Sequence, residues 1–149
     1  MATILVVDDH DTDRKLLRTL LGYAGHHVVE AADGAEALAA ASREMPDLVI
    51  SDILMPTMDG FEFVRSLRQN RSVAHVPVMF YSASYRGREA SRLASSCGVS
   101  RLLLKPSDPQ LILDAVSKIL GSSAEVRPLS PDFDQEHLRL VKNTLTRTA

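Results

Sequence analysis

Short apolar segments alternate with amphipathic helical segments from the first residues of the chain onward. The apolar runs are brief and continuous, as expected for strands that are covered by helices on both faces. A regular alternation of strands and helices is typical of a parallel sheet between two helical layers. The pattern therefore predicts a doubly wound α/β fold with five parallel strands.

Five strand and helix pairs account for the first part of the chain, residues 1–121. The expected strands are residues 3–7, 27–31, 47–51, 77–81 and 101–104. The expected helices are residues 12–24, 35–44, 61–69, 87–97 and 110–120. Gly25 is a plausible stop for the first helix, and Ser107-Asp108-Pro109 supplies a start signal for the last.

The rest of the chain, residues 122–149, has a different composition. The run GSSAEVRPLSPDF is rich in Ser and Pro and is typical of a linker. A polar helix is expected after it, with Leu138, Val141 and Leu145 in a stripe at heptad-like spacing. We therefore expect one domain over residues 1–121, followed by a linker and a C-terminal helix.

Composition excludes several classes of protein. No apolar run approaches the ~18 residues that a membrane helix needs, and the N-terminus lacks signal-peptide features, so we expect a cytoplasmic location and no membrane contact. The net charge of −2 favours neither anionic lipid nor direct nucleic-acid binding. The single cysteine, Cys97, is expected to be a buried core thiol, and the scattered histidines suggest no Cys/His metal cluster.

Charged and hydroxylic side chains follow four of the expected strands. Asp8 and Asp9 follow the first strand, Asp52 the third, Ser82 the fourth and Lys105 the fifth. Ligands of open parallel sheets bind beyond the carboxyl ends of the strands, so these groups should converge in one cleft. Taken singly, each also has an ordinary interpretation, as a helix cap, a turn residue or a surface lysine.

The clustered carboxylates predict a cation, because they repel one another when they are desolvated without a counter-charge. Mg²⁺ prefers hard oxygen ligands and retains waters that phosphate oxygens can replace. With such an ion bound, Asp52 can attack a phosphoryl group while Lys105 and Ser82 stabilise charge on the transferring oxygens.

The runs ILVVDDH, DLVISDILMPTMDG, VPVMFYSA and LLLKPSD resemble the marker segments of response-regulator receiver domains, in this order and spacing, over residues 3 to about 121. The resemblance implies a flavodoxin-like (βα)5 fold and a phosphoacceptor domain of a two-component system, not an enzyme in its own right. The implied donor is a histidine kinase or a phosphotransfer domain.

Site roles follow from the same resemblance, residue by residue. It implies that Asp52 becomes an aspartyl phosphate. It also implies that Asp9 ligates Mg²⁺ directly, that Asp8 assists directly or through water, and that the backbone carbonyl of Leu54 is a further ligand. Lys105 would pair with the phosphoryl oxygens and Ser82 would hydrogen-bond the phosphate. Pro56 and Gly60 would shape the loop after the acceptor.

Two departures from the family pattern concern output and dephosphorylation. Leu102 stands where the family commonly has an aromatic residue that follows the hydroxyl, so coupling between the two is in question. Output could instead use an aromatic and basic surface, or that surface could be an ordinary solvated helix face; its residues are Tyr81, Tyr85, Arg86, Arg88 and Arg92. Leu54 and Ser84 border the attacking water in the family, and an apolar Leu54 predicts slow autodephosphorylation.

The segment SPDFDQEHLRLVKNTLTR resembles the connector helices that join an N-terminal receiver to later domains of hybrid sensor histidine kinases. The alternative is a helix that folds back on its own domain or frays. Self-association or contact with a downstream domain is expected through the fourth helix, the fifth strand and this C-terminal helix.

Three rival functions are considered. An aspartate-nucleophile phosphatase of the haloacid dehalogenase class needs an acid two residues after the nucleophile, where this chain has Leu54. A nucleotide or flavin binder needs a glycine-rich first turn, but this turn reads DDHDTD. A receiver-like interaction module that works without phosphorylation is opposed only by the presence of every charged site residue.

Overall fold

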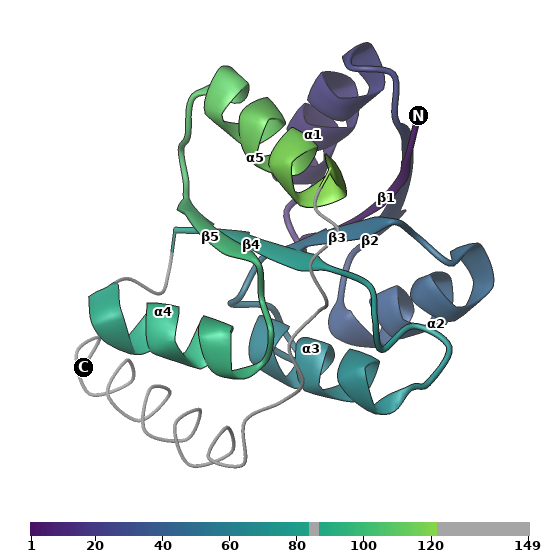
Figure 1. Cartoon of the computed structure of the whole chain (residues 1–149), viewed down its shortest axis with the longest axis vertical. Helices are drawn as coiled ribbons and strands as arrows, with labels where there is room; N and C mark the ends of the chain where they lie inside the picture. Colours follow the sequence, from purple (N-terminus) through teal and green to yellow (C-terminus); the bar gives the residue numbers. More distant parts are fainter. Residues whose placement is uncertain (84–86, 122–149) are drawn as a thin grey trace.

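The computed structural model describes residues 1–83 and 87–121 (Figure 1). The linker and helix predicted over residues 122–149 lie outside these residues, as do Ser84, Tyr85 and Arg86. No helix within the described ranges is long and apolar enough to cross a membrane.

The described residues form one parallel sheet of five strands with helices on both sides. The strands are β1 (Thr3–Val7), β2 (His27–Ala31), β3 (Leu48–Ser51), β4 (Val78–Ser82) and β5 (Arg101–Leu104). The helices are α1 (Asp11–Tyr23), α2 (Gly34–Glu44), α3 (Gly60–Gln69), α4 (Gly87–Ser96) and α5 (Pro109–Gly121). Helices α1 and α5 cover one face of the sheet and α2, α3 and α4 cover the other (Figure 1). The predicted doubly wound, flavodoxin-like (βα)5 fold is confirmed.

The strand order is β2-β1-β3-β4-β5, so the chain reverses its direction of winding between β1 and β3. Parallel pairing joins Val7 of β1 to Ser51 of β3, and Ser82 of β4 to Leu104 of β5. A crevice is expected outside the carboxyl ends of the strands at such a reversal. The residues that follow β1 and β3 therefore stand at the position where this fold class binds ligands.

Two of the helices, α2 and α3, begin at side-chain caps that the sequence supplies. Asp33 accepts a hydrogen bond from the backbone N of Glu36 at 2.8 Å, and Asp59 accepts one from the backbone N of Glu62 at 2.8 Å. Each carboxylate satisfies an N–H group that the helix itself cannot, and its negative charge suits the helix N-terminus. These caps fix where α2 and α3 start, close to the predicted boundaries.

Two hydrophobic cores lie on opposite faces of the sheet, as expected when both faces are covered. Phe61, Phe63 and Phe80 are fully buried in the core beneath α2, α3 and α4. The rings of Phe61 and Phe80 meet edge to face with centroids 5.2 Å apart. Cys97 lies in the same core, as predicted. The second core joins the other face to α1 and α5.

Arg68, near the end of α3, ties several loops to the first core. Its guanidinium donates to the backbone carbonyls of Ala74, Val76, Cys97 and Gly98. These bonds join the α3–β4 connection to the end of α4. The fork of N–H donors on arginine suits such a role, because one side chain satisfies several carbonyls that no helix or strand pairs.

Candidate functional site

Lys105 joins the residues that follow three strands of the sheet. Its Nζ lies 2.6 Å from Asp8 Oδ2, 2.9 Å from Asp13 Oδ2 and 3.2 Å from Asp52 Oδ2. Asp8 follows β1, Asp52 follows β3, and Lys105 itself follows β5. The sequence predicted that Asp8, Asp52 and Lys105 converge at this edge of the sheet, and the structure brings them into direct contact.

Asp52 is held at the centre of this cluster with little freedom to move. Its residue is 6% exposed, its Oδ1 accepts a hydrogen bond from the backbone N of Ile53 at 2.7 Å, and its Oδ2 faces Lys105. The backbone N of Asp52 also donates to the carbonyl of Val7 at 2.9 Å. A nearly buried carboxylate in a fixed orientation at the carboxyl edge of the sheet can act as a nucleophile toward an electrophile that binds there.

Gly60 allows its own backbone to pack closely against the backbone of Asp52 and Ile53. The backbone N of Gly60 donates to the carbonyl of Ile53 at 2.6 Å. A Cβ at this position would lie 2.5 Å from the backbone O of Asp52 and 2.8 Å from the Cα of Ile53. Both of those atoms are backbone atoms, so they could move aside only if the acceptor loop moved with them. The sequence-based expectation that Gly60 shapes this loop stays a prediction, and the close approach supports it.

The electrostatics of the cluster favour an added cation. Burial lowers the pKa of Lys105, but the hydrogen bonds to Asp8 and Asp13 and the charge of Asp52 outweigh it, so the pKa is raised and the ammonium stays charged. The Lys105 ammonium thus contacts three carboxylates, those of Asp8, Asp13 and Asp52, and the carboxylate of Asp9 lies near those of Asp8 and Asp52. Buried charges of one sign need a partner to remain ionised.

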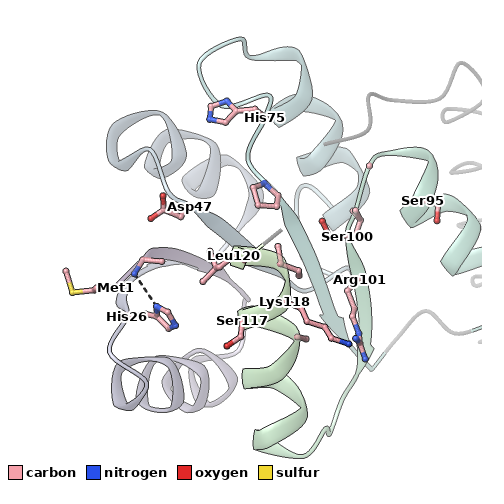
Figure 2. Close-up of a pocket in the computed structure, with 17 residues that line it drawn as sticks. Met1, His26, Asp47, His75, Ser95, Ser100, Arg101, Ser117, Lys118 and Leu120 are labelled. Carbon is pink, nitrogen blue, oxygen red and sulfur yellow. Dashed lines mark hydrogen bonds between the residues drawn. The ribbon is translucent and has the colours of Figure 1, made fainter. Parts of the chain in front are cut away.

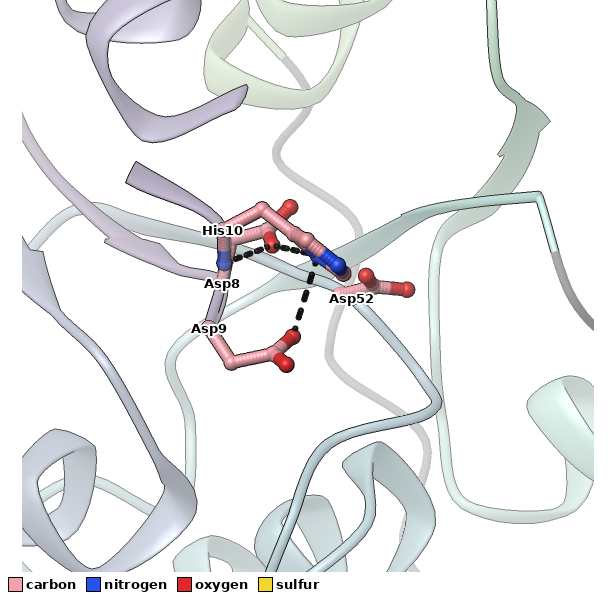
Figure 3. Close-up of side chains that lie close together, drawn as sticks. All are labelled: Asp8, Asp9, His10 and Asp52. Atoms are coloured by element: carbon pink, nitrogen blue, oxygen red, sulfur yellow. Dashed lines mark hydrogen bonds and ion pairs between the residues drawn. The ribbon is translucent and has the colours of Figure 1, made fainter. Parts of the chain in front are cut away.

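Asp9 has a carboxylate oxygen that is available to bind such a cation. Its Oδ1 is buried and makes no hydrogen bond among the described residues, and its contact with His10 Nδ1 at 3.3 Å is only an ion-pair distance. Possible ligand atoms of Asp8, Asp9, His10 and Asp52 all lie within 4.8 Å of one another (Figure 3). Carboxylate oxygens at this spacing fit Mg²⁺, which takes oxygen ligands and keeps waters of its own.

Ser82 lies at the same edge of the sheet, as predicted, although it joins the cluster through the backbone. It ends β4 and is fully buried, and its carbonyl accepts a hydrogen bond from the backbone N of Lys105 at 3.0 Å. This bond continues the pairing of β4 with β5, so it fixes the point at which Lys105 leaves the sheet. The following Lys105–Pro106 peptide bond is cis.

Tyr81 does not belong to the exposed surface that the sequence suggested beside the fourth helix. Its residue is 4% exposed, and its ring lies in the core beneath α1 and α5. Its hydroxyl accepts a hydrogen bond from the backbone N of Ser107 at 3.2 Å, and Lys105 Nζ lies 5.7 Å from the ring centroid. A doubly covered strand buries both of its faces, which is why Tyr81 points inward. Arg88 and Arg92 are exposed.

Two leucines, Leu54 and Leu102, stand at the positions where the sequence comparison with receiver domains leads us to expect other side chains. Leu54 lies two residues after Asp52 in the acceptor loop and is 52% exposed, so its side chain faces solvent. Leu102 is partly buried, pairs in register with Phe80 and packs against the first core. The aliphatic side chain of Leu102 packs in the core and has no donor or acceptor with which to form a hydrogen bond to Ser82.

Two contributors to the site were not singled out from the sequence. Asp13 is in the first turn of α1 and reaches Lys105, while His10 Nδ1 lies 3.3 Å from Asp8 Oδ1 and 3.3 Å from Asp9 Oδ1. The charge of Asp9, followed by contacts with Asp8, raises the pKa of His10. The signal was present in the run DDHDTD, because the first turn of a helix after a strand lies at the same sheet edge.

A separate groove of about 1100 Å³ lies at the opposite ends of the strands (Figure 2). Its lining includes Met1, Pro77 and Arg101, which stand at or just before the starts of β1, β4 and β5. The acidic cluster lies at the carboxyl ends of the strands, where parallel sheets bind ligands. The groove lies at their amino ends and is therefore separate from that cluster.

Comparisons with known proteins agree with the geometry. Residues 4–117 match the family profile described as "Response regulator receiver domain". Sensor protein EvgS of Escherichia coli strain K12 is 36% identical over 141 residues, which are 95% of this chain and 11% of that protein. Protein PilH of Pseudomonas aeruginosa is 32% identical over 122 residues, 81% of this chain and 99% of PilH.

A solved structure shows the same fold at similar identity. Chemotaxis protein CheY4 of Vibrio cholerae superposes with a TM-score of 0.76 at 34% identity, over 80% of this chain and 98% of that chain. The chain spans only 11% of the length of EvgS, whereas it covers nearly all of PilH.

Proposed function

Since the chain belongs to the family of response regulator receiver domains, we propose that Asp52 accepts a phosphoryl group from a phosphohistidine of a histidine kinase or phosphotransfer domain. A carboxylate oxygen of Asp52 forms the new O–P bond while the P–N bond to the donor histidine breaks. The product is an aspartyl phosphate, and the leaving imidazole takes up a proton.

Mg²⁺ would be held by the carboxylates of Asp9, Asp8 and Asp52 together with the backbone carbonyl of Leu54. When bound, it supplies positive charge at the non-bridging phosphoryl oxygens. The buried Oδ1 of Asp9, which makes no hydrogen bond within the described part of the chain, and the neighbouring carboxylates of Asp8 and Asp52 support this assignment.

Lys105 and Ser82 complete the proposed chemistry. The ammonium that contacts Asp8 and Asp52 would pair with a phosphoryl oxygen once Asp52 is modified, and its distance of 3.2 Å from Asp52 Oδ2 supports this role. Ser82 ends the strand beside β3, and its hydroxyl would donate to another phosphoryl oxygen. Both groups favour the negative charge that phosphorylation adds.

The single observation that carries the proposal is the contact of Lys105 with both Asp8 and Asp52 at the carboxyl edge of the sheet. An ordinary surface lysine would not be 12% exposed between carboxylates that are 2% and 6% exposed. Such buried charges persist in a fold when they serve a site.

The test is intact mass after incubation with acetyl phosphate and Mg²⁺. We expect one added phosphoryl group in the wild type and none in Asp52→Asn or in the presence of a chelator. Asp33→Asn is the matched control, because asparagine caps a helix as well as aspartate does and Asp33 lies at the start of α2. An unmodified wild type across several donors would favour an interaction module that works without phosphorylation.

Residues 122–149 are proposed to link the receiver, residues 1–121, to another domain. The similarity to the sensor protein covers 95% of the chain and so extends beyond the 4–117 region of the family profile. Limited proteolysis tests the boundary: we expect cleavage between residues 122 and 133 and a resistant fragment that ends near residue 121. Equal cleavage throughout residues 1–121 would contradict it.

A further inference from the structure

We propose that His10 is a nitrogen ligand of the divalent cation at this site and shifts its preference from Mg²⁺ toward Mn²⁺ and Co²⁺. The inference rests on the cation site of the proposed function and goes beyond it, because it assigns a role to a residue outside the expected ligand set. It concerns the choice of ion, not whether Asp52 is phosphorylated.

The backbone holds His10 beside the cluster. It is the N-cap residue of α1, with φ of −94° and ψ of 115°, and its backbone N donates to Asp8 Oδ1 at 2.9 Å. Its side chain is not used as a cap, and it is 65% exposed. The backbone therefore holds His10 beside Asp8, while most of the side-chain surface faces solvent.

The ring nitrogen already lies at a suitable distance from the other ligands. His10 Nδ1 is 3.3 Å from Asp8 Oδ1 and 3.3 Å from Asp9 Oδ1, and the ring reaches toward Asp52 (Figure 3). In an octahedral shell with metal–ligand bonds of about 2.1 Å, neighbouring ligand atoms lie roughly 3.0 Å apart. The two separations from His10 Nδ1 are thus only slightly longer than the edge of such a shell, and the possible ligand atoms of the whole group lie within 4.8 Å of one another.

An imidazole changes which ion an otherwise all-oxygen site prefers. Mg²⁺ favours oxygen ligands and gives up its waters reluctantly, so one nitrogen adds little to its binding. Mn²⁺ and Co²⁺ accept oxygen and imidazole ligands together, and they bind imidazole nitrogen more strongly than Mg²⁺ does. The carboxylates would still attract any divalent ion, while His10 would favour the transition metals.

The other histidines of the described residues are placed away from this cluster. His26 Nδ1 accepts a hydrogen bond from the backbone N of Ala2 at 3.2 Å, and both His26 and His75 line the groove at the opposite ends of the strands (Figure 2). His27 begins β2, also at that end. They therefore supply internal controls for any nitrogen signal from the protein.

The first experiment detects coordination directly, with tag-free full chain loaded with Mn²⁺. Electron spin-echo modulation should show a directly coordinated ¹⁴N in the wild type and in His26→Gln, and should lose it in His10→Gln. A ¹⁴N signal that persists in His10→Gln, or that is missing in the wild type, would overturn the proposal.

The second experiment measures selectivity from thermal unfolding at graded Mg²⁺, Mn²⁺ and Co²⁺. We expect His10→Gln to weaken Mn²⁺ and Co²⁺ binding about tenfold and to change Mg²⁺ binding by less than about twofold. Equal effects on all three ions, or none, would contradict a role in selectivity. If His10→Gln alters this selectivity but acetyl phosphate leaves the wild type unmodified, the phosphoacceptor function fails while this inference stands.

Discussion

Lys105 Nζ lies 2.6 Å from Asp8 Oδ2. This contact joins the residue after β5 to the residue after β1, although β3 and β4 lie between these two strands in the sheet. Both partners are nearly buried, with side chains 12% and 2% exposed. The pair therefore belongs to the strongly interacting class of charge pairs, in which removal of one partner leaves the other without compensation.

Lys105→Met should destabilise the protein by about 3 kcal/mol in the absence of divalent ions, because Asp8 and Asp52 lose their buried counter-charge. Urea unfolding measures the change, with Lys118→Met on the exposed side of α5 as the matched control. Mg²⁺ should restore part of the loss, since it replaces the missing positive charge. Equal stability of the two variants without metal would contradict this view of the cluster.

Asp9→Asn should stabilise the metal-free protein by roughly 1 kcal/mol, because it removes one negative charge from a carboxylate whose buried Oδ1 has no hydrogen-bond partner in residues 1–83 and 87–121. The variant should also lose most of the stabilisation by Mg²⁺, which for the wild type is about 1.4 kcal/mol at roughly tenfold Kd. Urea unfolding with chelator and with Mg²⁺ gives both quantities. If Mg²⁺ stabilises the variant and the wild type equally, Asp9 is not a ligand.

Gly60→Ala should cost about 2 kcal/mol or more and slow the phosphorylation of Asp52, because the new Cβ would meet the backbone O of Asp52 at 2.5 Å. Gly22→Ala in α1 is the matched control. Nothing lies within 4 Å of its Cβ position, so the alanine should be neutral or stabilising by up to ~1 kcal/mol. Denaturant midpoints and acetyl phosphate labelling check the contrast, and similar behaviour of the two variants would refute it.

Leu54→Asn should shorten the lifetime of the aspartyl phosphate roughly tenfold, since an amide can orient the attacking water and one such hydrogen bond contributes about 1.4 kcal/mol. Leu54 is 52% exposed, so the substitution should leave stability unchanged within about 0.5 kcal/mol. Decay of the phosphorylated mass in Mg²⁺ measures the lifetime. A wild-type lifetime of seconds would contradict slow autodephosphorylation.

Cys97 should resist alkylation at pH 8 in the folded protein and react once the chain is unfolded by urea. Burial raises the pKa of its thiol from 9.0 to about 12, so hardly any thiolate is present. Between pH 9 and pH 12 the folded state keeps a proton that the unfolded state has lost, so stability should fall as pH rises through this window. Cys97→Ala should be less stable overall, because it leaves a cavity, but should show a weaker fall. Rapid alkylation of the native thiol would disprove this environment.

The order of the helices and strands, and with it the identity of the main site residues, could be predicted from the amino-acid sequence. Apolar periodicity and cap signals are local properties, so they located β1 to β5 and placed Asp8, Asp9, Asp52 and Lys105 just beyond strand ends. The burial of Tyr81 could also have been expected, since strands between two helical layers bury both faces.

Which strand ends are neighbours, and which helix turns reach them, follows from the packing of the folded chain and could not be predicted from local sequence patterns. The order β2-β1-β3-β4-β5 brings β1 beside β3, and the first turn of α1 then delivers Asp13 to Lys105 while the N-cap residue His10 lies against Asp8 and Asp9. Such contacts join residues up to 97 positions apart, and they depend on the packing of the whole sheet and its helices, which no local pattern encodes.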